Sequence, residues 1–277
     1  MNQLSAVNLD ELWQKDQGWD AERKSGRKFD DKVELEFWEK TAPTYSNRYN
    51  LYRDTPQIAE KLKIFLGNGQ KIIDLGCGSG NFSIPLSNYS KEILALDFSP
   101  AMLRQLALRM KTEDCGNIRM VCSKWEDYTD DYQADFVIAV NSLYRVCYMR
   151  QVLSKIVLYG RKGFVIIRTL LRPQLYSLYR DLGISYRYNN DYILMPMMLW
   201  DMGINANVEY TSYIRRKRYS DFSAVEEEMK NDLGELSYLN FNDQLTEKFT
   251  QTMIEEKDGL AYDSERVVQI ISFKKQA

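Results

Sequence analysis

The sequence predicts an α/β protein built around a doubly wound, mostly parallel sheet. Three observations lead to this prediction: a globular composition, short apolar runs that alternate with helical patterns, and a glycine-rich turn directly after the first run. Of 277 residues, 44% are hydrophobic and 27% charged, with 14 Gly and 6 Pro. This composition is typical of a folded chain with a substantial core, and it excludes disordered or collagen-like classes.

Residues 1–54 carry helical patterns without a strong strand, and we predict a helical N-terminal extension there. The next helix begins at Thr55, where a capping hydroxyl precedes Pro56, and ends at the glycines around residue 68. Buried strands are then predicted at 71–75, 93–96, 118–122, 136–140 and 164–167, with helices near 81–88, 100–111 and 149–159. Such alternation predicts parallel strands with helices on both faces of the sheet.

The alternation ends after Arg168. Residues 171–206 are rich in Tyr, Met and Leu, and we expect them to be helical or irregular. Two late strands, at 208–214 and 267–273, flank helices over 224–229 and 243–256. The chain therefore predicts one large domain with additions.

The chain has no histidine, and its four cysteines form no CxxC pair. The usual zinc sites and the histidine-dependent triads of hydrolases therefore cannot be built, and we expect no metal. No apolar stretch approaches the roughly 18 residues that a membrane span needs. The N-terminus carries acids where a signal peptide carries basic and apolar residues. We expect a cytoplasmic protein that does not bind membranes.

A glycine-rich segment, Lys-Ile-Ile-Asp-Leu-Gly-Cys-Gly-Ser-Gly-Asn at 71–81, lies between the first strand and the next helix. Glycines there let the backbone approach a ligand closely, although a tight turn without a ligand is an alternative. Asn81 stands where the dinucleotide fingerprint needs its third glycine, which disfavours a pyrophosphate site. No Gly-Lys-Ser/Thr follows, so a P-loop is also disfavoured.

An acidic residue, Asp97, ends the second strand 23 residues after Asp74. A carboxylate at this edge of a parallel sheet can accept hydrogen bonds from both hydroxyls of a ribose. Ser99 and Pro100 are then expected to cap and open the following helix. The two motifs together predict a nucleoside-containing ligand.

These motifs resemble class I S-adenosylmethionine-dependent methyltransferases of the small-molecule type. Residues 74–80 are similar to the first motif of that family, and Asp135-Phe136-Val137 with the following Asn141-Ser142 resembles its fourth-strand motif. The resemblance covers residues 55–170 closely and implies a Rossmann-like, seven-stranded sheet that binds S-adenosylmethionine. It implies cofactor contacts from Asp74, Gly76, Cys77, Gly78, Gly80, Asn81, Asp97, Phe98, Ser99, Met102, Trp125, Glu126, Asp127, Asn141 and Ser142.

The N-terminal extension carries one further match. Residues 38–45, from Trp38 through Ala42 to Tyr45, are similar to the W-x-x-x-A-x-x-Y segment that many small-molecule methyltransferases fold over the cofactor as a lid. An aromatic helix that merely packs on the core is the alternative. Tyr45 is therefore a candidate for cofactor contact and for catalysis. Tyr144 is a second catalytic candidate. Relatives often carry a histidine at its place, so one familiar candidate for substrate contact or for the base is absent here.

Methyl transfer needs a nucleophile held in line with the methyl group and shielded from water, whereas a dedicated base is optional. Family placement divides the chain into an extension or lid at 1–54 and a methyltransferase domain at 55–277, with a substrate cap at 171–206. In the cap, these side chains are expected either to line an apolar-aromatic pocket or to pack on the sheet: Tyr176, Tyr179, Tyr186, Tyr188, Tyr192, Met195, Met197, Met198 and Trp200. The chain lacks the Asp/Asn-Pro-Pro-Tyr/Phe tetrapeptide after the fourth strand, which disfavours methylation of nucleobase exocyclic amines and glutamine amides.

Four arginines gather around the expected acceptor cavity: Arg168, Arg172, Arg180 and Arg187. They favour an acceptor that carries a carboxylate or phosphate, unless they face solvent or pair with Asp181 and Asp191. Arg168 is the third catalytic candidate.

Residues 215–218, Arg-Arg-Lys-Arg, could form a nucleic-acid patch, but one short cluster in a chain of net charge −2 fits the solvated end of a strand better. We therefore predict SN2 methyl transfer to a small-molecule acceptor, for which an anionic group is one option. The alternatives are a protein or RNA methyltransferase, and a protein that binds the cofactor without catalysis.

Overall fold

A computed structural model describes residues 7–22, 26–49, 55–170, 172–185 and 189–276. The chain divides into two compact units. Unit 1 comprises residues 1–168, 190–210 and 269–277, and unit 2 comprises 169–189 and 211–268. No described helix is long and apolar enough to cross a membrane.

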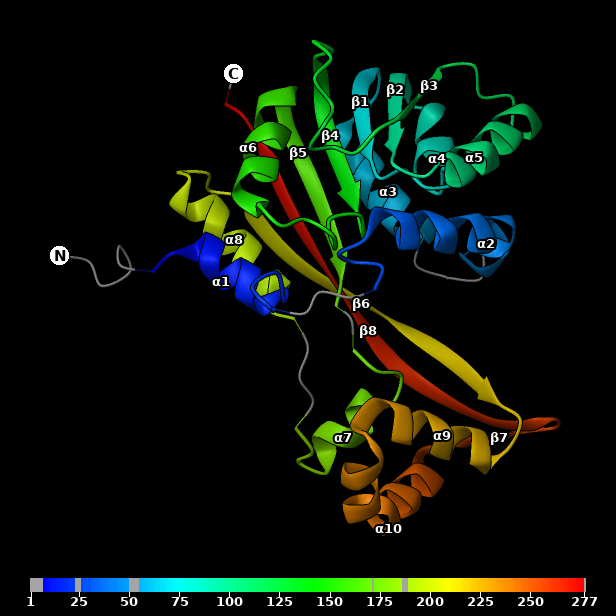
Figure 1. Cartoon of the computed structure of the whole chain (residues 1–277). Helices are drawn as coiled ribbons and strands as arrows, with labels where there is room; N and C mark the ends of the chain where they lie inside the picture. The colour runs from blue at the N-terminus through cyan, green and yellow to red at the C-terminus, as the bar shows by residue number, and fades with distance from the viewer. Residues whose placement is uncertain (1–6, 23–25, 50–54, 171, 186–188, 277) are drawn as a thin grey trace. The chain divides into compact units, whose positions relative to one another are not determined.

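One sheet of eight strands has the order β3-β2-β1-β4-β5-β8-β6, and the short β7 pairs with β8 (Figure 1). The strands are β1 (Gln70–Leu75), β2 (Ser90–Asp97), β3 (Ile118–Cys122), β4 (Ala134–Val140), β5 (Gly160–Thr169), β6 (Asn207–Tyr219), β7 (Ile254–Glu256) and β8 (Gly259–Lys274). Strands β1 to β5 pair in parallel. The predicted doubly wound, mostly parallel sheet is confirmed, with β7 as an addition to the seven strands expected.

Helices account for most of the remaining chain. They are α1 (Leu9–Asp16), α2 (Asp31–Tyr49), α3 (Thr55–Leu66), α4 (Ser83–Ser87), α5 (Pro100–Thr112), α6 (Met149–Tyr159), α7 (Tyr176–Asp181), α8 (Asp191–Asp201), α9 (Phe222–Leu233) and α10 (Glu235–Thr252). The predicted capping of α5 is confirmed, since Ser99 Oγ accepts the amide of Met102 and Pro100 opens the helix.

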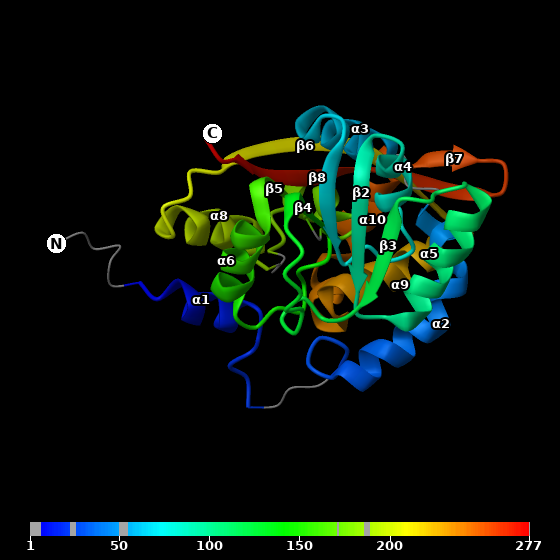
Figure 2. The same ribbon diagram turned by 90° about the horizontal axis from the view of Figure 1, so that it is seen from above.

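The core of unit 1 lies on both faces of the parallel strands. Ile73 and Leu75 of β1 share one apolar cluster with Trp13 of α1 and Met198 of α8. Figures 1 and 2 show α1, α6 and α8 together on that side of the sheet. On the other face, the ring of Phe65 of α3 meets the ring of Phe136 of β4 edge-on, with the centroids 5.8 Å apart. Burial on both faces explains why these strands form continuous apolar runs in the sequence.

Unit 2 has a separate core, formed by α7, α9, α10 and the adjoining parts of β6 and β8. Its apolar cluster includes Tyr179 and Phe249, both fully buried. Asp221 caps α9 by accepting the amide of Ala224 at 3.1 Å. Thr250 and Thr252 hydrogen-bond back into the last turns of α10.

The predicted cap at 171–206 does not form one structural piece. Helix α7 packs in the core of unit 2, whereas Met195 and Met198 of α8 are buried in unit 1 with α1 and α6. The predicted extension at 1–54 also belongs to unit 1. Both differences arise because each amphipathic helix joins whichever apolar surface buries it, and the local sequence does not identify that surface.

Candidate functional site

The carboxyl ends of β1, β2 and β4 lie side by side because these strands are parallel and in register. Leu75, the last residue of β1, pairs with Leu96 of β2 on one side and Ala139 of β4 on the other. The glycine loop after β1, the acid after β2 and the Asn-Ser pair after β4 therefore meet at one edge of the sheet. Ligands of open α/β sheets bind at this edge.

The glycine loop is held by contacts that only glycine permits. Gly76 and Gly78 have φ values of 70° and 56°, in the left-handed region. A Cβ on Gly76 would lie 2.3 Å from the Cβ of Ser142. The amides of Gly76 and Cys77 both donate to Leu96 O, at 2.7 and 3.1 Å. The loop's own packing therefore requires glycine, a reason that the sequence alone did not show.

Asp97 links the glycine loop to the start of α5. Its Oδ2 accepts the amide of Gly78 at 2.8 Å, and its Oδ1 accepts the amide of Ser99 at 2.8 Å. Burial raises the pKa of Asp97, and the negative charge of Glu34 adds to this, although the two amide hydrogen bonds oppose it. Each carboxylate oxygen can accept a further hydrogen bond.

Two predicted site residues, Asp74 in β1 and Cys77 in the loop, are buried. Asp74 is 2% exposed and accepts a hydrogen bond from Ser83 Oγ at 2.5 Å. Burial raises the pKa of Asp74 to about 7, with a smaller contribution from the charge of Asp97. Burial and the same two carboxylates raise the pKa of the Cys77 thiol. Cys77 is therefore a protonated thiol, unsuited to act as a nucleophile.

The loop after β4 supplies a buried hydroxyl with no partner. Asn141 has a φ of 53°, which an asparagine tolerates better than most residues, and its amide donates to Ile167 O at 2.9 Å. Ser142 follows and lies against Gly76. Its Oγ is buried without a hydrogen-bond partner among the described residues. A buried polar atom of this kind indicates a missing partner, such as a ligand.

A carboxylate of the N-terminal segment, Glu34 of α2, is built into the same region. It is 1% exposed and accepts hydrogen bonds from Arg27 Nε at 2.8 Å, from Trp38 Nε1 at 2.6 Å and from the Tyr144 hydroxyl. Burial alone would raise the pKa of Glu34, but these hydrogen bonds hold this pKa below its ordinary value. Burial and the charge of Glu34 raise the pKa of Tyr144. Sequence analysis did not identify Glu34, because its partners lie up to 110 residues away.

A second acid of α2, Asp31, contacts the loops after β3 and β4. It accepts hydrogen bonds from Lys124 and, at 2.8 Å, from Arg145. These bonds outweigh burial and lower the pKa of Asp31. The two cations lie 5.4 and 5.5 Å from the ring of Phe98, which follows Asp97. Helix α2 is therefore tied to the edge of the sheet where the site lies.

The predicted lid motif packs on the start of α5. Ala42 and Met102 are buried together, and Trp38 and Tyr45 pack against them, with the two rings 5.3 Å apart. Because Met102 lies in the first turn after Ser99, the motif lies next to the site. This contact fits both the lid and the core-packing interpretations of Tyr45.

Comparisons with known proteins agree with this geometry. Residues 72–162 match the family described as a methyltransferase domain. These residues therefore form a methyltransferase domain. A putative methyltransferase structure from Bacillus halodurans has a TM-score of 0.52 at 14% identity, covering 79% of this chain and 99% of that one.

Curated relatives of this methyltransferase domain are distant and matched in part. An uncharacterized protein of Haemophilus influenzae is 27% identical over 61% of this chain and 63% of its own length. A malonyl-[acyl-carrier protein] O-methyltransferase of Paenibacillus is 30% identical over 37% of this chain and 39% of its own. A tRNA/tmRNA (uracil-C(5))-methyltransferase of Neisseria meningitidis is 32% identical over 24% of this chain and 18% of its own length. The chain thus spans less than two thirds of these relatives' lengths.

The residues at the sheet edge suit S-adenosylmethionine chemically. Asp97 offers further acceptor sites for ribose hydroxyls, and the Ser142 hydroxyl lacks a partner. Two other residues predicted for the methyltransferase site have mainly internal contacts. Gly80 packs against Leu106, where a Cβ would lie 2.4 Å from Cδ1. Asn81 Oδ1 accepts from Arg109 at 3.0 Å, which fixes the end of the loop against α5.

Trp125, predicted to hold the adenine edge, has its side chain in the core. The indole is 4% exposed, stacks on Tyr128 with ring centroids 5.9 Å apart, and meets Tyr159 of α6 edge-on. Glu126 and Asp127 are exposed beside it. An adenine contact from these three residues stays a prediction, and the exposed pair is better placed for it than the indole.

The arginines predicted around the acceptor cavity are largely engaged. Arg168 Nε lies 2.5 Å from Asp191 Oδ2, and both side chains are at most 10% exposed. Arg180 pairs with Asp181 at 2.9 Å, and the Arg172 guanidinium lies over the ring of Tyr176. The structure therefore favours the pairing that the sequence analysis left open. Arg187, like Tyr186 and Tyr188, lies outside the described residues.

The cap side chains mostly serve packing. Tyr179 is fully buried and donates to Asp232 at 2.9 Å, and Met195 and Met198 are buried in unit 1. Trp200 is 70% exposed. Tyr176, Tyr192 and Met197 are half-buried.

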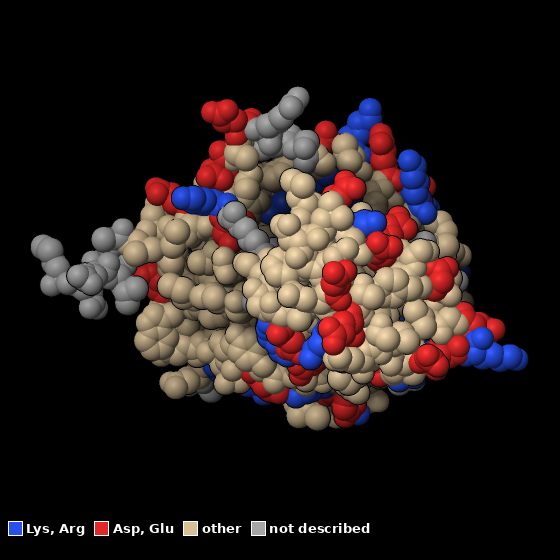
Figure 3. All heavy atoms as spheres, turned by 90° about the horizontal axis from the view of Figure 1, so that it is seen from below, with Lys and Arg blue, Asp and Glu red and all other residues tan. Residues whose placement is uncertain are grey.

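The basic cluster at 215–218 is largely neutralised within unit 2. Arg216 pairs with Asp263 at 2.7 Å, Lys217 with Glu228 at 2.6 Å and Arg218 with Glu256 at 2.5 Å. On the face seen in Figure 3, basic side chains are interspersed with acidic ones. These observations disfavour a continuous phosphate-binding surface.

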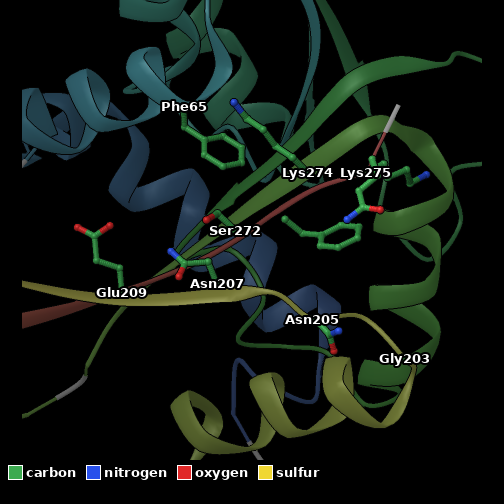
Figure 4. Close-up of a pocket in the computed structure, with 10 residues that line it drawn as sticks. Phe65, Gly203, Asn205, Asn207, Glu209, Ser272, Lys274 and Lys275 are labelled. Atoms are coloured by element: carbon green, nitrogen blue, oxygen red, sulfur yellow. The ribbon is translucent and has the colours of Figure 1, made fainter.

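An open depression of about 780 Å³ lies elsewhere in unit 1, at the end of β8 (Figure 4). Its lining is mostly polar and includes Asn205, Asn207 and Ser272. Lys274 lies 4.6 Å from the ring of Phe65 there. None of its lining residues belongs to the predicted methyltransferase site.

Proposed function

We propose that this chain is an S-adenosylmethionine-dependent methyltransferase that acts on a small-molecule acceptor by SN2 displacement. The proposal is carried by one observation: Asp97, the glycine loop and the unpartnered Ser142 hydroxyl meet at the carboxyl edge of the sheet. The methyltransferase-family match over residues 72–162 supports it.

Asp97 would hold the ribose through the acceptor sites left on its two oxygens, and the loop at 76–80 would lie along the cofactor. The Ser142 hydroxyl would form one hydrogen bond with the cofactor, as donor or as acceptor. When bound, S-adenosylmethionine supplies a methyl group whose C–S bond breaks with its electron pair staying on sulfur, while the acceptor's lone pair forms the new bond. The chain's own contribution is orientation and exclusion of water, which can supply on the order of 7–11 kcal/mol.

Tyr144 donates its hydroxyl proton to Glu34. Because burial and the carboxylate of Glu34 raise the pKa of Tyr144, its hydroxyl stays protonated at neutral pH and cannot act as a base. Arg168 is committed to Asp191. We therefore propose an acceptor atom that attacks as a free lone pair, such as an amine or a thiolate, which needs no base from these two residues.

RNA is the second candidate acceptor, because one stretch of 66 residues is 32% identical to a tRNA/tmRNA (uracil-C(5))-methyltransferase. That stretch covers 18% of the relative, whereas the match to the O-methyltransferase of Paenibacillus covers 39% of that protein. The basic cluster at 215–218 is also taken up by acids of unit 2. We therefore favour the small-molecule acceptor.

Calorimetric titration with S-adenosylmethionine tests the proposal. Asp97→Asn should weaken binding by about tenfold or more, since hydrogen bonds to a charged group contribute about 1.5–3 kcal/mol each. Asp243→Asn, at an exposed position of α10 outside the predicted site, is the matched control. A folded parent protein that binds neither cofactor form would contradict the proposal. Labelled methyl incorporation into RNA, falling steeply with salt, would favour the second candidate instead.

A further inference from the structure

Glu34 stands out among the buried groups because it places a negative charge beside the cofactor site from outside the matched domain. Its three hydrogen-bond partners come from different directions: Arg27 precedes α2, Trp38 lies one turn along α2, and Tyr144 follows β4. A carboxylate held in this way has a fixed position. Its charge therefore acts on the site as a constant electrostatic field.

Contacts on two sides place this charge next to the proposed ligand. Tyr144 follows Ser142 by two residues, and Ser142 lies against Gly76. Trp38 belongs to the cluster with Met102 at the start of α5. The field of Glu34 also reaches Asp97, whose pKa it raises.

The two forms of the cofactor differ by one charge. The methyl donor has a sulfonium, an ammonium and a carboxylate, and so a net charge of +1 at neutral pH. Once the methyl group has left, sulfur is a neutral thioether and the net charge is zero. A fixed negative charge stabilises the first form and has little net effect on the second.

We infer that Glu34 sets the preference of the site for the cationic methyl donor over the neutral demethylated product. This inference rests on the proposed function. Its consequence is that loss of the positive charge during methyl transfer weakens the hold of the site on the product and favours exchange for fresh donor. Glu34 acts here through its charge and needs no covalent step.

Two variants that break the same ion pair separate this role from a structural one. Glu34→Gln removes the negative charge and keeps an oxygen that accepts hydrogen bonds from Tyr144 and Trp38. Arg27→Gln removes the positive partner and leaves the carboxylate. Loss of structure would weaken binding of both ligands in both variants. The charge effect instead changes the donor-to-product affinity ratio in opposite directions.

The affinities for S-adenosylmethionine and S-adenosylhomocysteine are measured by calorimetry for each protein. In Glu34→Gln the ratio of donor to product affinity should fall, on the order of tenfold, the usual size of an interaction between two unit charges that lie near each other in a protein without touching. In Arg27→Gln the ratio should rise, and by less, because the Arg27 side chain is 38% exposed and screened by solvent. Glu39→Gln, in the exposed pair with Arg104, is the control and should leave the ratio unchanged.

The outcomes are distinguishable. A parent protein that binds neither ligand contradicts the proposed function itself. Binding of both ligands with the same ratio in parent, Glu34→Gln and Arg27→Gln overturns the inference about Glu34 alone. If Glu34→Gln does not fold, a ratio in Arg27→Gln that stays constant or falls still overturns it.

Discussion

Replacing Asp191 by asparagine should destabilise unit 1, because Asp191 is the counterion of a buried arginine. Arg168 Nε lies 2.5 Å from Asp191 Oδ2, and the side chains are 8% and 10% exposed. Asparagine keeps the shape of the side chain and one oxygen acceptor but removes the charge. The guanidinium of Arg168 would then remain buried without a counterion.

Removal of one partner from a buried ion pair costs about 3–5 kcal/mol, against about 0–1 kcal/mol for an exposed pair. Lys28 adds to the cost here. Burial lowers the pKa of Lys28 to about 8, with Arg168 lowering it further and Asp16 and Asp191 opposing. Without Asp191 the two cations face each other with less compensation. We therefore expect the free energy of unfolding to fall by about 3 kcal/mol or more.

Urea unfolding followed by tryptophan fluorescence measures this loss in unit 1 alone. All five tryptophans of the chain belong to that unit: Trp13, Trp19, Trp38, Trp125 and Trp200. Glu209→Gln is the control, because its pair with Lys61 is 42% and 48% exposed and should cost less than about 1 kcal/mol. A loss below about 1 kcal/mol in Asp191→Asn would refute the argument. If Asp191→Asn is stable but has a raised KM for its acceptor, the result would indicate that Arg168 binds the substrate.

Three further outcomes are expected. Trp13→Phe should cost about 1–3 kcal/mol in urea unfolding, because the indole, 1% exposed, donates to the buried Val146 O at 2.8 Å. Asp74→Asn should flatten the pH dependence of the free energy of unfolding. The pKa of Asp74 is about 7 in the folded protein and near 4 in the unfolded chain. The protonated carboxyl therefore contributes stability that is fully present below about pH 4 and is lost as the pH rises through 7. An unchanged stability difference between parent and variant from pH 4 to 8 would speak against this. Gly76→Ala should abolish cofactor binding in calorimetry, since its Cβ would lie 2.3 Å from that of Ser142, and normal affinity would show that the loop relaxes freely.

Sequence patterns predicted the parts of the fold that depend on local rules. The inner strand β4 is buried on both faces and so forms an almost continuous apolar run, and the edge strand β3 was predicted with its observed ends although three of its five residues are exposed. The start of α5 followed from Ser99 and Pro100. Asp97 and the glycine loop were paired by their spacing, and the structure joins them through the Gly78 amide.

Contacts between distant parts of the chain were not predicted. Tyr144 and Glu34 are 110 residues apart, and neither residue type signals the other. The ion pair of Arg168 with Asp191 was one of two open alternatives, and burial at both ends decides it. The segment 171–206 was treated as one cap because family placement puts the substrate cover between the fifth strand and the late strand pair. Only long-range packing shows that Tyr179 and Met198 enter different cores.

The N-terminal segment, which precedes the matched residues 72–162, supplies acidic side chains at the edge of the sheet where we propose the site. Asp31 pairs with Lys124 and Arg145, the two cations beside Phe98, and offsets one of their two positive charges, while Glu34, itself paired with Arg27, places a negative charge next to Asp97. Without α2, those loops would present an excess of positive charge to a ligand that is itself cationic. We therefore expect the electrostatic fit to the methyl donor to depend on α2 together with the sheet edge, and not on the glycine loop alone.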